Sequence, residues 1–119
     1  MHRVNLSEKF DAIHEHWSPK IAGEVNDTHV KLVKAQGEFV WHSHAHEDEM
    51  FLVVKGSFDM HFRDRVETVS EGEFIIVPRG VEHKPVAEGE VQILLVEPKG
   101  TLNTGDAHDP RTVTHVERI

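Results

Sequence analysis

Residues 41–56, with the sequence WHSHAHEDEMFLVVKG, limit what this chain can fold into more than any other stretch. His42 and His44 stand two positions apart, and side chains two apart on a β-strand point to the same face. Glu49 follows at the head of an apolar run, so a turn over residues 45–48 would bring it beside the histidines on the next antiparallel strand. Two imidazoles and one carboxylate that converge in this way match a metal site with open coordination positions.

A fourth ligand is expected from residues 72–83, with the sequence GEFIIVPRGVEH. Pro78 fixes φ at the start of a turn and Gly80 supplies conformational freedom, directly after an apolar strand. The turn would direct His83 back toward the hairpin, and donors on separate strands suit a rigid metal cage. The candidate metal ligands are therefore His42, His44, Glu49 and His83.

Alternatives to this ligand set remain open. His46 could pair with His44 in a shifted His-x-His, although it falls within the expected turn and leaves few residues before the next strand. Glu47 or Asp48 could replace Glu49 as the carboxylate, although turn residues are expected to face solvent. A further alternative is that the histidines are buried and hydrogen-bonded without any metal.

The composition indicates a soluble globular protein and excludes several functions. The 119 residues form one domain, with 38% hydrophobic and 29% charged residues. The absence of cysteine excludes disulfides, thiolate ligands and a cysteine nucleophile. No apolar run approaches the roughly 20 residues of a membrane span, and the polar start is not typical of a signal peptide, so we expect a cytoplasmic protein without a membrane partner. A net charge of −8 argues against nucleic acid as a partner.

The N-terminal residues predict a helix and then a lead-in strand. Four apolar residues recur at helical spacing: Leu6, Phe10, Ile13 and Trp17. Ser7 can cap the first turn, and the helix is expected to end before Pro19. Residues 1–27 are therefore assigned to this helix and strand, residues 28–98 to a barrel, and residues 99–119 to a C-terminal tail, all in one domain.

Many short strands separated by turn signals follow, which is typical of an antiparallel sandwich or barrel. The predicted strands span residues 28–34, 38–44, 50–54, 58–62, 66–69, 74–77 and 91–96. Gly56 and Gly72 stand between strands where tight turns favour positive φ.

Two motifs in this region resemble those of the cupin superfamily. The first is formed by Gly37, His42, His44, Glu49 and Gly56, and the second by Gly72, Pro78, Gly80 and His83. The motifs stand in the family's order with 15 residues between them. Two positions depart from the pattern: the spacing before the first histidine is one residue short, and Ala87 replaces the closing Asn of the second motif. Neither position supplies a ligand in the family.

The resemblance implies an all-β fold, the antiparallel double-stranded β-helix or jelly-roll barrel, with a short N-terminal helix added in this chain. It also implies activities such as those of dioxygenases or sugar isomerases, with likeness to mannose-6-phosphate isomerase. Three histidines and one carboxylate suit a divalent transition metal, and the sequence does not choose among Zn, Fe, Mn, Ni and Cu. Four ligands on a six-coordinate metal would leave two adjacent positions for water, a substrate or dioxygen.

A small-molecule metalloenzyme is therefore the first hypothesis for the function. The alternative is a non-catalytic module that binds a metal and a small ligand, and a lesser one is a purely structural metal. Whether the protein is an enzyme stays uncertain at this point, and no catalytic residue is assigned. Further residues that could surround the metal, although a structural role is favoured for each, are Trp41, Met60, His61, Arg79 and Gln92.

The strands at residues 50–54 and 74–77 are apolar on both faces. A barrel buries one face, so the other needs a second layer or another subunit, which predicts a homodimer. Residues 99–119 are polar and contain turn signals. They are expected to be either a flexible terminus or an arm over the neighbouring subunit.

Overall fold

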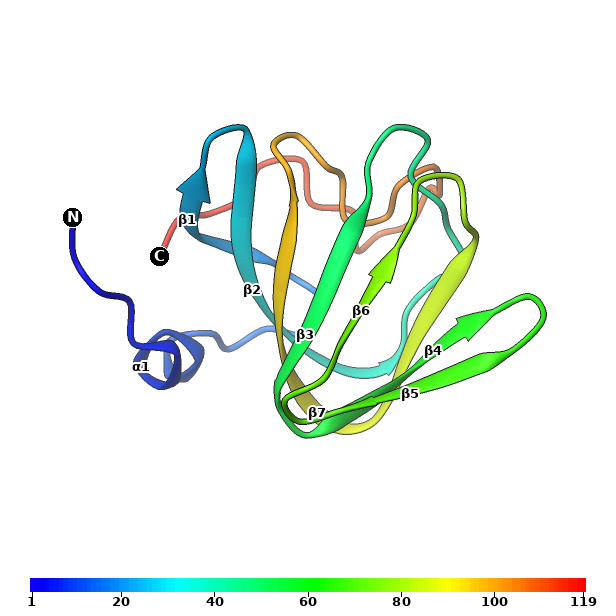
Figure 1. The fold of residues 1–119 in the computed structure, drawn as a ribbon, viewed down its shortest axis with the longest axis horizontal. Coiled ribbons are helices and arrows are strands. Elements are labelled where there is room, and N and C mark those ends of the chain that lie inside the picture. The colour runs from blue at the N-terminus through cyan, green and yellow to red at the C-terminus, as the bar shows by residue number, and fades with distance from the viewer.

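The computed structural model describes all 119 residues and contains one short helix and seven strands. The elements are α1 (Leu6–Asp11), β1 (Lys20–Val25), β2 (Thr28–Glu38), β3 (Glu49–Lys55), β4 (Ser57–Phe62), β5 (Val66–Ser70), β6 (Phe74–Val77) and β7 (His83–Pro98) (Figure 1). No helix has the length and apolar character that a membrane crossing requires.

The strands pair antiparallel throughout, in the order β1-β2-β7-β3-β6, and β4 pairs with both β5 and β7. Strand β7 belongs to two layers, because its first residues pair with β4 and its last residues pair with β3. Figure 1 shows the β4–β5 hairpin lying across the curled sheet. The predicted antiparallel jelly-roll barrel with a short N-terminal helix is confirmed.

The interior of the barrel is apolar over most of its length and polar at one end. Alternate residues of each strand point inward, which gives a core of twelve buried apolar side chains. Four buried charged or titratable side chains lie where β2 and β3 begin and β7 ends: His29, Lys31, Glu49 and Glu97. The polar groups of the fold are therefore concentrated at one end of the barrel.

The N-terminal helix is shorter than predicted. It ends at Asp11, and Asn5 rather than Ser7 caps its first turn. Trp17 lies outside the helix with φ of 61°, and its ring stacks on Phe39 at a centroid distance of 4.7 Å. The prediction failed because packing against the barrel decides this segment, and a helix of six residues has little stability of its own.

Two predicted strands also differ from the structure. Strand β2 contains the whole predicted stretch at 28–34 but ends at Glu38, so the rest of the predicted stretch at 38–44 lies outside it. The pairing register of β2 with β7 is irregular between Ala35 and Gly37. The residues after it contact the sheet through isolated interactions, such as the bridge between His42 and His83 and the hydrogen bond from the Phe39 amide to the Pro85 carbonyl at 3.0 Å. The two histidines of the His-x-His motif therefore lie on a loop beside the sheet rather than on a regular strand.

The C-terminal segment, residues 99–119, folds back onto the barrel of its own chain. The Ser43 amide donates to Asp106 Oδ1 at 2.8 Å, and the Asp106 amide donates to the Ser43 carbonyl at 3.0 Å. The last residue reaches β1, where the Ile119 amide donates to the Ile21 carbonyl at 2.9 Å. Figure 1 shows this segment, drawn in orange and red, running along the end of the barrel at which β3 begins.

Candidate metal centre

The four predicted ligands come together at the polar end of the barrel. One donor atom from each side chain lies within 4.8 Å of the others, and all four side chains are buried. Glu49 is the first residue of β3 and His83 the first residue of β7, while the other two lie on the loop between β2 and β3. The convergence of His42, His44, Glu49 and His83 matches the arrangement that the sequence predicted.

Backbone contacts orient two of the imidazoles. The amides of His42 and His83 each donate to the carbonyl of the other, at 3.0 and 2.9 Å. The Nδ1 atom of His42 lies 2.8 Å from the Val40 carbonyl, and that of His83 lies 2.8 Å from the Val81 carbonyl. Because a carbonyl can only accept, Nδ1 carries the proton in both rings. The Nε2 lone pairs are therefore free for a metal.

The Glu49 carboxylate lies close to the ring nitrogens of His44 and His83. Its Oε1 atom is 3.0 Å from His44 Nε2 and 3.6 Å from His83 Nε2. Adjacent ligands that each lie about 2.1 Å from an octahedral metal are separated by about 3.0 Å. Glu49 Oε1, His83 Nε2 and both His44 ring nitrogens are buried without a hydrogen-bond partner. Such atoms cost about 1–3 kcal/mol each when unpaired, so this donor set fits a divalent metal.

Burial and neighbouring charges shift the pKa values of these groups in different directions. Burial lowers the pKa of His42 to about 4, and the neighbouring imidazole of His83 acts in the same direction. Burial also acts to lower the pKa of His44, but the Glu49 carboxylate more than offsets it and raises the pKa above its usual value. Burial acts to raise the pKa of Glu49, but His44 and His83 outweigh it and hold the pKa below its usual range. Because a metal ligand must be deprotonated, metal binding would compete with protonation of the His44 ring.

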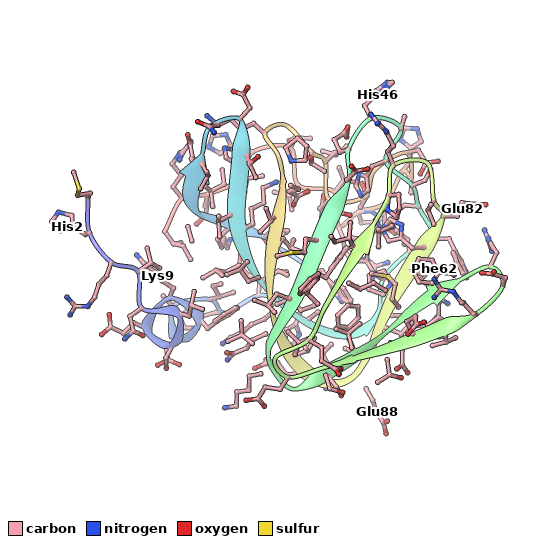
Figure 2. All side chains as sticks on the ribbon, viewed as in Figure 1. His2, Lys9, His46, Phe62, Glu82 and Glu88 are labelled. Atoms are coloured by element: carbon pink, nitrogen blue, oxygen red, sulfur yellow. The ribbon has the colours of Figure 1, made fainter.

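The alternative ligands lie outside this cluster. His46 is exposed at the tip of the loop (Figure 2). Asp48 is exposed and accepts a hydrogen bond from the Arg79 amide at 2.8 Å, and Glu47 is only half-buried. Neither the shifted histidine pair nor another carboxylate of the loop joins the four buried donors.

A cavity adjoins the cluster and extends into the barrel. Its open space is about 460 Å³, including the part that faces solvent, and about 40 Å³ of it admits the centre of a water molecule. His42 and Glu49 form part of its wall, so the metal centre would face this space. The remaining lining residues are Trp17, Pro19, Val33, Phe39, Phe51, Pro85, Ile93, Leu95, Glu97 and Asn103. The space suits a small, largely apolar molecule.

Glu97 also lines the cavity, and the sequence analysis did not identify it as a candidate site residue. Glu97 as a whole is 3% exposed, and Lys31 Nζ lies 3.4 Å from its Oε1 atom, while Oε2 has no partner. Burial and the nearby charge of Glu49 raise its pKa well above the usual value, against the opposing charge of Lys31. The signal was present, because Glu97 continues the inward-facing alternation of Ile93 and Leu95 on β7.

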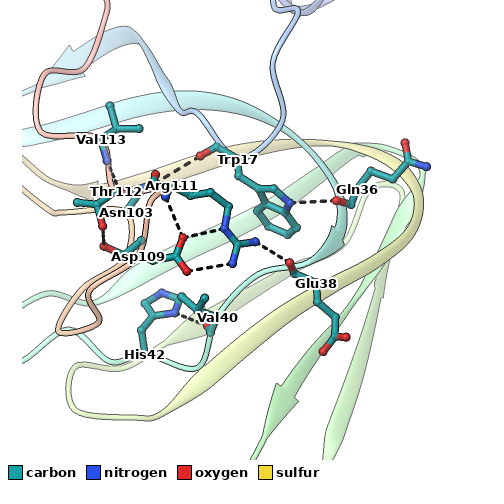
Figure 3. A network of polar contacts seen from close by, with 11 residues as sticks. Trp17, Gln36, Glu38, Val40, His42, Asn103, Asp109, Arg111, Thr112 and Val113 are labelled. Carbon is teal, nitrogen blue, oxygen red and sulfur yellow. Dashed lines mark hydrogen bonds and ion pairs between the residues drawn. The ribbon is translucent and has the colours of Figure 1, made fainter.

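The C-terminal segment and the chain around Trp17 close one side of the cavity (Figure 3). Trp17 Nε1 donates to the Gln36 carbonyl at 3.0 Å. Arg111 pairs with Asp109 and donates to the Glu38 carbonyl at 2.8 Å. None of the five further candidates from the sequence lines the cavity: Trp41, Met60, His61, Arg79 and Gln92. Long-range contacts therefore enclose this side of the site.

Comparisons with known proteins agree with this fold. The structure is similar to that of a cupin-2 domain containing protein from Shewanella frigidimarina, with 47% identity, a TM-score of 0.80, and coverage of 81% of this chain and 94% of that one. Protein YdbB of Bacillus subtilis is 34% identical over 77 residues, which are 64% of this chain and 68% of that protein.

A third similarity is more limited. A mannose-1-phosphate guanylyltransferase of Sinorhizobium fredii is 34% identical over 56 residues, which are 47% of this chain and only 11% of that protein. The model of the cupin domain family matches residues 28–97, which include both motifs and all four clustered donors. The chain therefore belongs to the cupin domain family.

Proposed function

We propose that this protein binds one divalent transition metal through His42, His44, Glu49 and His83, and that it is a metalloenzyme acting on a small molecule in the adjoining cavity. The observation that carries the proposal is the set of buried donor atoms without hydrogen-bond partners at the wall of a cavity. A purely structural metal is disfavoured, because His42 and Glu49 face open space rather than closing the site. Zn, Fe, Mn, Ni and Cu all suit this donor set.

The residues of the chain would contribute orientation and exclusion of water. A divalent metal supplies Lewis-acid chemistry, and iron or copper also supplies oxygen chemistry. The largely apolar lining limits water around a bound molecule, which strengthens polar contacts at the metal. Dioxygenase and sugar-isomerase reactions are the proposed classes. A non-catalytic module that binds a metal and a small ligand would use the same site, and turnover of simple diketones, phenols or sugar phosphates under air separates the two.

Metal binding is expected to release a proton in the histidine range of pH. The pKa of His44 lies above its usual value of about 6.5, so more than half of the His44 rings are protonated at pH 6.5. Metal binding at this pH therefore releases more than half a proton per protein molecule from this ring. The apparent affinity therefore falls as the pH drops through this range, and proton release fades as the pH rises above the pKa of His44. Calorimetric titration with Zn²⁺ in two buffers of different ionisation enthalpy measures the release. Binding without proton release at pH 6.5 would contradict the proposed role of His44.

We also propose that the protein forms a homodimer through the outer face of β3 and β6. Phe74 and Ile76 are 60% and 54% exposed, and they pair with the partly exposed Leu52 and Met50 on β3. Sedimentation velocity is expected to show a dimer for the wild type and a monomer for Ile76→Lys. The control is Val66→Lys, which changes a similarly exposed apolar residue on β5 and should stay dimeric. A monomeric wild type would refute the dimer.

A further inference from the structure

Trp17 has an unfavourable backbone conformation at the wall of the cavity. Its φ of 61° lies in the left-handed region, which bulky residues rarely adopt, so the contacts around it must offset a cost in free energy. Its amide donates to the Lys34 carbonyl at 2.8 Å. Its Nε1 atom donates to the Gln36 carbonyl at 3.0 Å (Figure 3). These contacts hold the indole ring in one position beside the cavity.

The wall that the strands provide differs from the wall at Trp17. Four lining residues on β2, β3 and β7 belong to the buried apolar core: Val33, Phe51, Ile93 and Leu95. Close packing fixes these side chains, so they cannot move for a larger ligand without disturbing the barrel. Trp17 is half-buried and lies between α1 and β1, outside any regular element. Its ring therefore contacts both the cavity and the solvent.

Trp17 and Phe39 form an aromatic wall that reaches the proposed metal ligands. The two rings stack at a centroid distance of 4.7 Å, with 22° between their planes. The Phe39 ring in turn meets the His42 ring edge-on at 5.4 Å. All three residues line the cavity, so a molecule bound at the metal centre would lie beside this aromatic wall.

The space inside these walls is small. About 40 Å³ of the cavity admits the centre of a water molecule. One water molecule needs roughly 10–15 Å³ by this measure, so there is room for about three or four atoms of that size. A body with more atoms must push a wall aside, and overpacking of this kind weakens binding.

We propose that Trp17 is a specificity-determining residue that limits the size of the small molecule bound at the metal centre. The ligand class is then a small molecule with a metal-binding head and a compact apolar body of about three or four non-hydrogen atoms. A longer body is excluded because it would overlap the Trp17 ring, which the stack on Phe39 and the hydrogen bond to Gln36 hold in place. This role rests on the proposed metal site and adds a size limit to its ligand.

Three hydroxamates with the same metal-binding head and unbranched tails of different length test this role on the Co²⁺-loaded protein. The tails are methyl in acetohydroxamate, propyl in butyrohydroxamate and pentyl in hexanohydroxamate. Each probe is titrated while the visible absorption of Co²⁺ is recorded, which reports coordination without any assay of activity. The wild type is expected to bind the pentyl probe about tenfold more weakly than the propyl probe, because the longer tail overpacks the cavity.

Trp17→Gly removes the ring, and glycine adopts the positive φ of this position without strain. In this variant the pentyl probe is expected to bind at least about threefold more tightly than the propyl probe, because each buried CH₂ group strengthens binding by up to about fourfold. The methyl probe should bind within about threefold of the wild type. Trp17→Phe leaves a smaller ring beside Phe39 and should bind the two longer probes with nearly equal affinity.

Leu6→Ala is the matched control. It shortens another half-buried apolar side chain of the N-terminal segment, which packs against the cluster of Phe10, Ile13 and Leu32 and does not line the cavity. This variant should keep the preference of the wild type for the propyl probe. Circular dichroism and the Co²⁺ content of each variant confirm that it is folded and loaded.

The outcomes separate the role of Trp17 from the proposed function. A preference for the propyl probe that persists unchanged in Trp17→Gly overturns this role, and Trp17→Phe answers the same question if the glycine variant does not fold. A wild type that binds the pentyl probe more tightly than the propyl probe overturns the size limit without any variant. Full Co²⁺ loading with no response to any probe overturns the ligand site and leaves the metal centre standing. A protein that takes up no Co²⁺ refutes the metal centre and the role of Trp17 together.

Discussion

Replacing His83 by alanine is expected to lower the affinity for Zn²⁺ by at least about a hundredfold, because changes to residues that only support a metal ligand already cost 10–100-fold. His83 Nε2 is buried without a hydrogen-bond partner and lies 3.6 Å from Glu49 Oε1, so its loss removes a donor that no neighbour replaces. Competition with a chromophoric chelator measures the affinity of both proteins, and thermal unfolding of the metal-free forms shows whether the fold is retained.

His46→Ala is the matched control for this substitution. It removes the same side chain from the loop that carries His42 and His44, but His46 is exposed and lies outside the cluster. Its Zn²⁺ affinity should stay within about threefold of the wild type. Equal losses of Zn²⁺ affinity in the two variants would contradict the assignment of the four clustered side chains as the ligands.

Gly105→Ala is expected to cost at least about 3 kcal/mol of folding free energy and to weaken metal binding as well. A Cβ atom at this position would lie 2.2 Å from the Ser43 carbonyl oxygen and 3.2 Å from the His42 ring, at a φ of +54°. Overpacking and strained backbone each cost about 1–3 kcal/mol. Ser43 stands between the two loop histidines, so displacing its backbone also displaces proposed ligands. Denaturant unfolding and Zn²⁺ titration measure the two effects.

Gly100→Ala separates the close contact from the strain of positive φ. Its φ is +83°, but an added Cβ atom would meet nothing within 4 Å. This variant should lose about 1–2 kcal/mol and keep its Zn²⁺ affinity. If Gly105→Ala lost no more stability than Gly100→Ala, the close packing of the C-terminal segment on the His-x-His loop would be wrong.

The four clustered side chains could be predicted because the relevant signals are local. The spacing of His42 and His44, the position of Glu49 at the head of an apolar strand and the turn before His83 are all visible in the sequence. The backbone at the first motif differs from the prediction, since His42 and His44 lie on a loop and not on a regular strand. The bridge between His42 and His83 orients the loop in place of a continuous ladder.

The enclosure of the site could not be predicted, because it depends on contacts between distant residues. Trp17 was assigned to a helix, yet its ring packs on Phe39 and lines the cavity. Asp106 binds the Ser43 backbone across 63 positions, and no local pattern marks such a contact. The alternation of inward-facing residues on β7 predicts that Glu97 faces the interior, but the apolar run before it predicts only a packing role.

The metal content of wild-type protein, purified without added metal or an affinity tag, tests the central claim most directly. Elemental mass spectrometry compares it with the double variant His42→Ala, His83→Ala. The account predicts close to one equivalent of a divalent transition metal in the wild type and almost none in the variant. A wild type that stays empty after Zn, Fe, Mn, Ni and Cu have each been offered would contradict it, and the buried cluster would then be a structural feature of the barrel alone.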